Sequence, residues 1–235
     1  MAGLCDHFDV SMNTVRRDIV RLLERGTVEK VYGGVSARRS EQLTSFDVRT
    51  VSRSQSKMRI GEKAASFVED GDIIFIDSGT TTMYVVQHIA QCKNVTILTN
   101  NLQCINMAMP YPNINVLILP GQLQRETNSF TGMDTITSLR NYHIKKAFMA
   151  ASAISLTNGV TNSSSLEYEI KRIALQQSEK KYLLVDNGKF DRTAMLTYAQ
   201  LSDFTCLVTD VPPPEVYRRA CEKAAVGLAV YQETK

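Results

Sequence analysis

The chain has 235 residues, of which 43% are hydrophobic and 22% charged, so it is long enough for one substantial and one small domain, and disorder is not expected. Its formal net charge of +3 is uneven, because residues 1–59 hold 11 Lys and Arg against 7 Asp and Glu, and a basic head favours a polyanionic partner. The 5 cysteines are scattered without a CxxC pair, and no signal peptide or membrane-spanning apolar run is visible, so we expect a cytoplasmic protein that has no membrane partner.

The first predicted elements make a small helical head. Leu4, Cys5 and Phe8 share one side of a helical turn, and a second helix over residues 12–25 has apolar residues at three- and four-residue spacing, with Ser11 at its N-cap. Residues 27–32 alternate like a strand before a Gly pair, so the order of elements predicts a winged helix-turn-helix. The polar face of the second helix predicts contacts with bases and phosphates in a major groove. We assign DNA binding to this face and the wing: Ser11, Asn13, Thr14, Arg16, Arg17, Arg21 and Tyr32. The alternative is an amphipathic helical hairpin whose arginines are merely solvated.

Residues 36–56 are polar and basic and show neither a helical nor a strand period, which predicts a linker. Residues 1–35 then form a partial winged helix-turn-helix domain, and residues 57–235 form a second domain. The basic side chains of the linker are also compatible with contact to the DNA backbone, but a solvated connector accounts for its composition better.

The second domain alternates between apolar strands and helical segments. After a helix that begins at residue 57, we expect strands near 73–77, 95–99, 114–119, 146–152, 181–186 and 205–209, and a last one near 226–231. Helices are expected near 82–91, 102–109, 133–140 and 166–178. This alternation predicts the α/β class, with a mainly parallel, Rossmann-like sheet covered by helices on both faces.

In such a sheet, ligands bind beyond the carboxyl ends of the strands. The first strand is followed by Asp77, Ser78, Gly79, Thr80, Thr81 and Thr82 at the start of a helix. A glycine turn with N–H groups and hydroxyls there predicts a phosphate cradle, and ordinary helix capping is the alternative. Because neither GxxxxGK[ST] nor GxGxxG occurs, no ATP or NAD is implied and we expect no cofactor. Later strand ends add Thr99, Asn100, Arg125 and Lys189 as candidate ligands of an anionic effector.

The head contains a run from Phe8 to Ile19, with two arginines followed by an aspartate, and the segment Val31-Tyr32-Gly33-Gly34-Val35. With these two segments the head resembles the DNA-binding signature of the DeoR family of bacterial repressors. Members of that family normally have a further helix before the point where this sequence begins. We therefore expect an incomplete head with Leu4, Phe8, Val15 and Ile19 partly uncovered, and poor DNA binding by this chain.

The second domain is similar to the sensor domain of the same family. Its matching segments are residues 76–82, 98–100, 130–132, 146–148 and 185–190. The resemblance implies a fold like that of ribose-5-phosphate isomerase, an effector that is a phosphorylated sugar or sugar alcohol, and a place for Gly132 in the effector site. The chain departs from the family pattern at Pro120 and Ala151, so the identity of the effector does not carry over.

Together with the patterns above, the resemblance implies a transcriptional repressor of a carbohydrate-utilisation operon, tuned by a phosphorylated sugar and acting as a dimer or tetramer on operator DNA. The alternative is a sugar-phosphate isomerase-like enzyme, for which Asp77 and Glu167 are the only candidate bases. His7, His88 and His143 are scattered, so we expect neither a catalytic set nor a metal site. A second alternative is an interaction module whose α/β domain serves only for oligomerisation.

Overall fold

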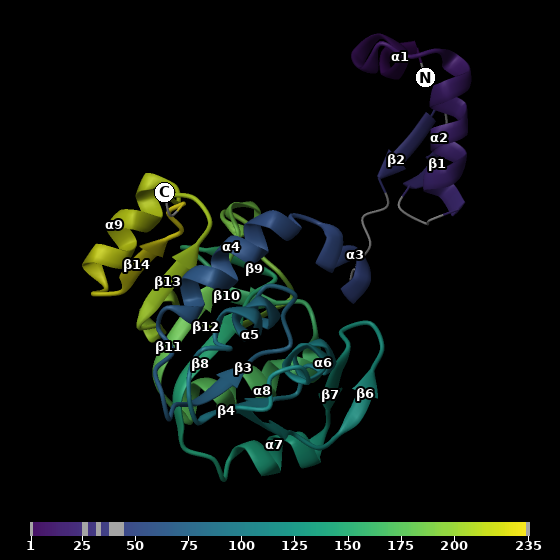
Figure 1. Ribbon diagram of the computed structural model, residues 1–235. Helices are drawn as coiled ribbons and strands as arrows, with labels where there is room; N and C mark the ends of the chain where they lie inside the picture. Colours follow the sequence, from purple (N-terminus) through teal and green to yellow (C-terminus); the bar gives the residue numbers. More distant parts are fainter. Residues whose placement is uncertain (1, 25–27, 32–33, 38–44, 234–235) are drawn as a thin grey trace. The chain divides into compact units, whose positions relative to one another are not determined.

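The computed structural model describes residues 2–24, 28–31, 34–37 and 45–233. The chain divides into two compact units, Met1–Leu43 and Thr44–Lys235. In the first unit, helices α1 (Ala2–Phe8) and α2 (Met12–Glu24) are followed by the antiparallel strands β1 (Val28–Val31) and β2 (Gly34–Ala37) (Figure 1). This is the predicted order of helix, helix and hairpin.

Side-chain burial in the first unit follows the apolar face of α2. Val15 is only 6% exposed, because α2 packs against both α1 and β1. The expectation that Val15 would be partly uncovered is therefore wrong. Phe8 is 64% exposed, and Leu4 and Ile19 are half-buried, as expected.

The second unit is built on a seven-stranded sheet in which every pairing is parallel. The strand order is β14 (Gly227–Val230), β13 (Cys206–Thr209), β11 (Ser178–Leu184), β8 (Ile144–Ala150), β3 (Ile73–Ile76), β4 (Val95–Thr99) and β5 (Ile114–Ile118). Each of these strands coincides with one of the seven predicted from apolar runs. The α/β class and the parallel sheet are confirmed.

Helices cover both faces of this sheet because successive strand residues point to opposite sides. Ile74 and Ile76 pack into one core with helices α4 (Ser54–Ala65), α5 (Val85–His88) and α6 (Leu102–Ala108). Phe75 packs into the other core with α7 (Met133–Leu139), α8 (Ser165–Gln176) and α9 (Glu215–Lys223). Figure 1 shows the sheet between these layers.

Smaller elements lie outside this pattern. Strands β6 (Gln122–Gln124) and β7 (Ser129–Thr131) form a hairpin, and β12 (Leu196–Ala199), β10 (Gly159–Asn162) and β9 (Ala153–Ser155) form an antiparallel sheet. Short 3-10 turns occupy η1 (Thr82–Tyr84), η2 (Asn187–Lys189) and η3 (Leu201–Asp203). None of the helices in the described ranges combines the length and apolarity that crossing a bilayer requires.

The irregular linker expected over residues 36–56 is wrong at its C-terminal end. Helix α3 (Phe46–Val51) forms there, and α4 begins at Ser54. A helix of one and a half turns is too short to show a period in the sequence, and of its residues only Phe46 is buried. The two helices belong to the second unit.

Candidate functional site

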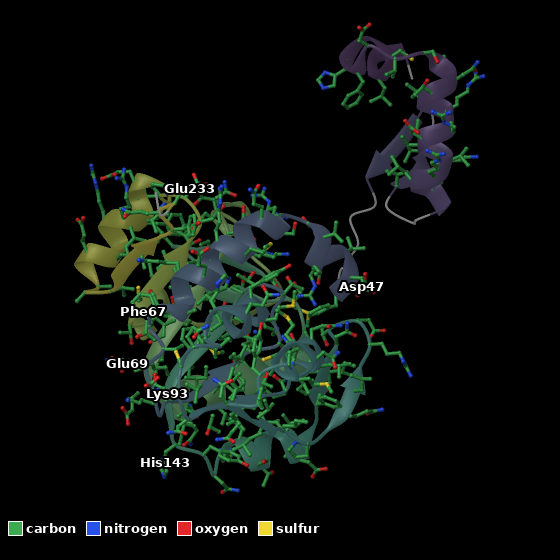
Figure 2. All side chains as sticks on the ribbon, in the orientation of Figure 1. Asp47, Phe67, Glu69, Lys93, His143 and Glu233 are labelled. Atoms are coloured by element: carbon green, nitrogen blue, oxygen red, sulfur yellow. The ribbon has the colours of Figure 1, made fainter. Side chains whose placement is uncertain are left out.

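Most of the residues predicted to bind an effector lie at the carboxyl ends of the parallel strands. Figure 2 labels Glu69, Lys93 and His143, which precede β3, β4 and β8 and mark the amino edge of the sheet. Asp47 of α3 is labelled on the other side of the same unit. Helix α3 thus lies toward the edge at which the strands end, where the sequence predicted a ligand site.

A buried ion pair lies where β3 and β8 end. Asp77 is 1% exposed, and its Oδ2 accepts hydrogen bonds from the ammonium of Lys171 on α8 and, at 2.9 Å, from the backbone N–H of Ala150. Lys171 also donates to the carbonyl of Ala150 at 3.2 Å, and so does the hydroxyl of Tyr198 at 2.9 Å. The pair fixes the end of β3 against β8 and α8.

A second buried carboxylate, Glu167, is one helical turn before Lys171 on α8. Its Oε1 accepts hydrogen bonds from Ser78 at 2.6 Å and from Ser129 at 3.0 Å. Its Oε2 is 3.4 Å from the amide nitrogen of Asn162. Since three donors hold this carboxylate, it is an organiser of the strand ends rather than a group that is open to accept a proton.

The loop after β3 has several hydrogen-bond donors that lack partners among the described residues. The backbone N–H groups of Ser78, Gly79, Thr80 and Thr81 make no hydrogen bond to any described residue, and neither do the hydroxyls of Thr80 and Thr81. Thr82 differs, because its Oγ1 donates to the carbonyls of Asp77 at 2.7 Å and Gly79 at 2.9 Å. Consecutive backbone N–H groups without partners suit an anion.

One sequence-based detail of this loop is corrected. The helix expected over residues 82–91 is a 3-10 turn followed by the short α5, so its dipole contributes less than expected. At Gly79, a Cβ would lie 2.2 Å from the Cβ of Ala150. The glycine is required because the loop after β3 approaches the end of β8 closely.

The residues that follow β4 divide into structural and open groups. Thr99 donates from Oγ1 to the Ile76 carbonyl at 2.6 Å and accepts from the N–H of Asn101. Asn101 caps α6 through its side-chain oxygen. Asn100 is 0% exposed and donates to the Phe130 carbonyl at 3.0 Å, but its Oδ1 has no donor among the described residues. It is a buried acceptor that is left open.

A group of cations surrounds the end of β11. Asp186 is 1% exposed and lies 3.6 Å from the guanidinium of Arg53. Burial lowers the pKa of Lys189, against the charge of Asp186, and the neighbouring arginines lower it further. Burial also lowers the pKa of Lys57 to about 8, opposed by Asp186 and supported by nearby cations. Positive charge therefore exceeds negative charge around this strand end.

Two other predicted residues lie on the β6–β7 side of the unit. Arg125 is exposed in the turn of the β6–β7 hairpin. Gly132 has φ 134° and stands at the N-cap of α7, with open space where a Cβ would project. No described contact joins either residue to the loop after β3, so their role stays a prediction.

Other chemistry has little support in the described residues. No group of three or more His, Cys, Asp or Glu side chains within the described ranges is arranged to hold a metal ion. Burial raises the pKa of Cys104 to about 12 and that of Cys206 to about 11. Both thiols are protonated at neutral pH, which argues against nucleophilic or redox use.

The first unit carries its polar face on α2. Ser11 caps the helix by accepting from the Thr14 N–H at 3.2 Å, and Thr14 is half-buried. The other candidates on α2 are exposed: Asn13, Arg16, Arg17 and Arg21. Asp18 lies 4.0 Å from the Arg17 guanidinium and 3.8 Å from that of Arg21, which leaves Arg16 outside these pairs. Tyr32, expected in the wing, lies outside the described residues.

Several residues near the candidate site were missed from the sequence, and Glu167 was considered only as a possible base of an isomerase. Lys171 follows Glu167 by four positions on a predicted helix whose other buried positions are apolar, and charged residues on an apolar helical face are a signal that was available. Arg49, Arg53 and Lys57 were assigned to a linker and to the start of a helix. Only the fold brings them to the strand ends.

Comparison with known proteins finds one family match in the N-terminal part of the chain and another in the C-terminal part. The DeoR-like helix-turn-helix domain family matches residues 2–41, and the DeoR C terminal sensor domain family matches residues 52–211. The chain is 45% identical to the HTH-type transcriptional regulator IolR of Bacillus subtilis, over 96% of this chain and 90% of that protein. It is 29% identical to the glycerol-3-phosphate regulon repressor of Escherichia coli, over 90% and 84%.

Among solved structures, the chain is similar to a D-ribose-5-phosphate isomerase in complex with phospho-erythronic acid. The TM-score is 0.43 and the identity 15%, and the match covers 58% of this chain and 54% of the isomerase chain.

Proposed function

The chain belongs to the DeoR family of transcriptional regulators, and we propose from this that it is a repressor of a carbohydrate-utilisation operon whose effector is a phosphorylated sugar or sugar alcohol. Helix α2 and the wing bind operator DNA, and the carboxyl edge of the sheet in the second unit binds the effector. The protein acts as a dimer or tetramer, since symmetric operators are read by paired heads.

The observation that carries the effector proposal is the set of open donors after β3. The N–H groups from Ser78 to Thr81 and the hydroxyls of Thr80 and Thr81 have no partner among the described residues. A phosphate offers several acceptor oxygens and satisfies such donors together. The cations around Lys189 supply the opposite charge, and the open Oδ1 of Asn100 suits a sugar hydroxyl as donor.

An enzymatic role has less support. An isomerase needs a carboxylate that is open to take a proton from the sugar carbons. Asp77 is paired with Lys171, and Glu167 accepts from Ser78 and Ser129. Both carboxylates are committed to hydrogen bonds within the fold, and the relatives with assigned names are regulators of transcription.

Repression is relieved only if the effector binds the DNA-free state more tightly than the DNA-bound state. The effector therefore stabilises an arrangement of the second unit in which the heads no longer fit the operator. Equal affinity of the effector for free and DNA-bound protein would contradict this mechanism.

Calorimetric titration with sugar phosphates tests the site. Thr81→Val and Lys189→Met are each expected to weaken binding about tenfold or more, because each removes a hydrogen bond to a charged group. Thr137→Val is the matched control, since Thr137 is exposed on α7, and its affinity should equal that of the wild type. Unchanged affinity in both site variants would refute the proposed placement.

A further inference from the structure

The segment from Ser45 to Lys57, here called the arm, belongs to the second unit and is partly buried in it. At its start, the side chain of Phe46 is 2% exposed and its N–H donates to the Glu126 carbonyl at 2.9 Å. At its end, Lys57 is 4% exposed and its ammonium donates to the carbonyl of Arg49 within the arm. The arm is thus an ordered part of the unit rather than a solvated connector.

Between α3 and α4, Arg53 makes a sharp connection. Its φ of 55° and ψ of 36° lie in the left-handed region, which residues other than glycine seldom adopt. Its guanidinium hydrogen-bonds the side-chain oxygen of Asn187 and lies 3.6 Å from Asp186. A Cβ on Gly188 would lie 2.4 Å from the Arg53 Cζ, so the glycine leaves the space in which the guanidinium sits. These contacts compensate for the unfavourable backbone of Arg53.

The arm also carries charge to the strand ends. Burial lowers the pKa of Arg49, while the negative charges of Glu167 and Asp77 raise it. Those carboxylates belong to the strand-end network beside the open loop, whereas Lys57 and Lys189 interact with Asp186 at the end of β11. Within the arm, Arg49 therefore interacts with the carboxylates beside the open loop, and Lys57 interacts with Asp186 at the end of β11. Cations in such a low-dielectric position interact with a bound anion more strongly than solvated cations do.

We propose that the arm is part of the effector site: Arg49 and Lys57 bind the anionic group of the effector together with Lys189, and the Arg53–Asp186 pair holds the arm in place. This inference rests on the proposed function, because it requires an anion at the carboxyl edge of the sheet. The arm also gives the site a route to the head. It begins two residues after Leu43, where the first unit ends, so effector binding that shifts or further stabilises α3 acts directly on the chain that leads to the DNA-binding domain.

Titration of the full chain with inorganic phosphate tests the binding role of the arm. Arg49→Met is expected to raise the dissociation constant about tenfold, the effect of losing one charge-assisted hydrogen bond. Arg59→Met is the matched control on α4, because the Arg59 guanidinium lies over the ring of Tyr231, and its dissociation constant should stay within about twofold of the wild type. An unchanged dissociation constant in Arg49→Met overturns the inference.

Hydrogen exchange on the wild-type chain tests the same idea without a substitution. Phosphate is expected to slow exchange at the α3 amides of Arg49 and Ser52, which bond to the carbonyls of Ser45 and Val48, and also at the open N–H groups from Ser78 to Thr81. Protection of the loop without protection of α3 overturns the role of the arm and leaves the proposed function standing. Protection of neither segment contradicts the proposed function itself.

Discussion

Gly79→Ala tests the close packing between the loop after β3 and the end of β8. The new Cβ would lie 2.2 Å from the Cβ of Ala150, whereas carbon atoms are in favourable contact at about 3.5–4.0 Å. Relief requires the loop and the end of β8 to separate by more than about 1 Å, and such overpacking costs about 1–3 kcal/mol. We expect the upper end, because Ala150 also bonds to Asp77 and Lys171, so its displacement strains a buried ion pair.

A second substitution provides the control. Ala150→Gly removes the atom that the new methyl group would strike, and alone it costs about 0.5–1 kcal/mol for a glycine in a strand. The double variant Gly79→Ala/Ala150→Gly is therefore expected to be more stable than Gly79→Ala alone. Urea unfolding followed by far-ultraviolet circular dichroism measures each free energy of unfolding, since the chain has no tryptophan. If Gly79→Ala unfolds like the wild type, or if the two costs simply add, the packing argument is wrong.

Two further predictions concern buried charges. Lys171→Met leaves Asp77 charged and buried without its ion-pair partner, so we expect a loss of about 3–5 kcal/mol in urea unfolding and partial recovery in Lys171→Met/Asp77→Asn; an unchanged unfolding midpoint would contradict this. Lys57 has its pKa lowered from 10.5 to about 8, mainly by burial. Because the unfolded chain binds more protons between these values, the free energy of unfolding should rise from about pH 8 to 10.5 relative to that of Lys57→Met, and parallel pH profiles of the two proteins would contradict this.

The architecture of the second unit was predictable because parallel strands buried on both faces are continuous apolar runs. Residues such as Ile74, Phe75 and Ile76 alternate between two cores, so no polar residue interrupts them. Helix α9 and the sheet of β9, β10 and β12 were not predicted. The three strands of that sheet are only three or four residues long, which is too short for a recognisable period.

The candidate site was predictable only where it follows a strand. Asp77 and the threonines after it lie directly at a strand end, and topology alone brings them to the carboxyl edge of the sheet, where ligands bind in such folds. The pairing of Asp77 with Lys171, by contrast, joins residues 94 positions apart, and nothing local in the sequence indicates it. Arg49 was hidden for another reason, because α3 is ordered by contacts such as the one between Phe46 and Glu126 rather than by its own helical pattern.

The proposal that the chain binds a phosphorylated effector is tested most directly by thermal unfolding with a panel of sugar and sugar-alcohol phosphates. Each phosphate is paired with its unphosphorylated form. A ligand at 100 times its dissociation constant stabilises the folded state by about 2.7 kcal/mol, which corresponds to about 5–10 °C in the midpoint for a unit of this size. We expect such a shift with at least one phosphorylated compound and none with its free sugar. Equal shifts with both members of a pair, or no shift across the panel, would contradict it.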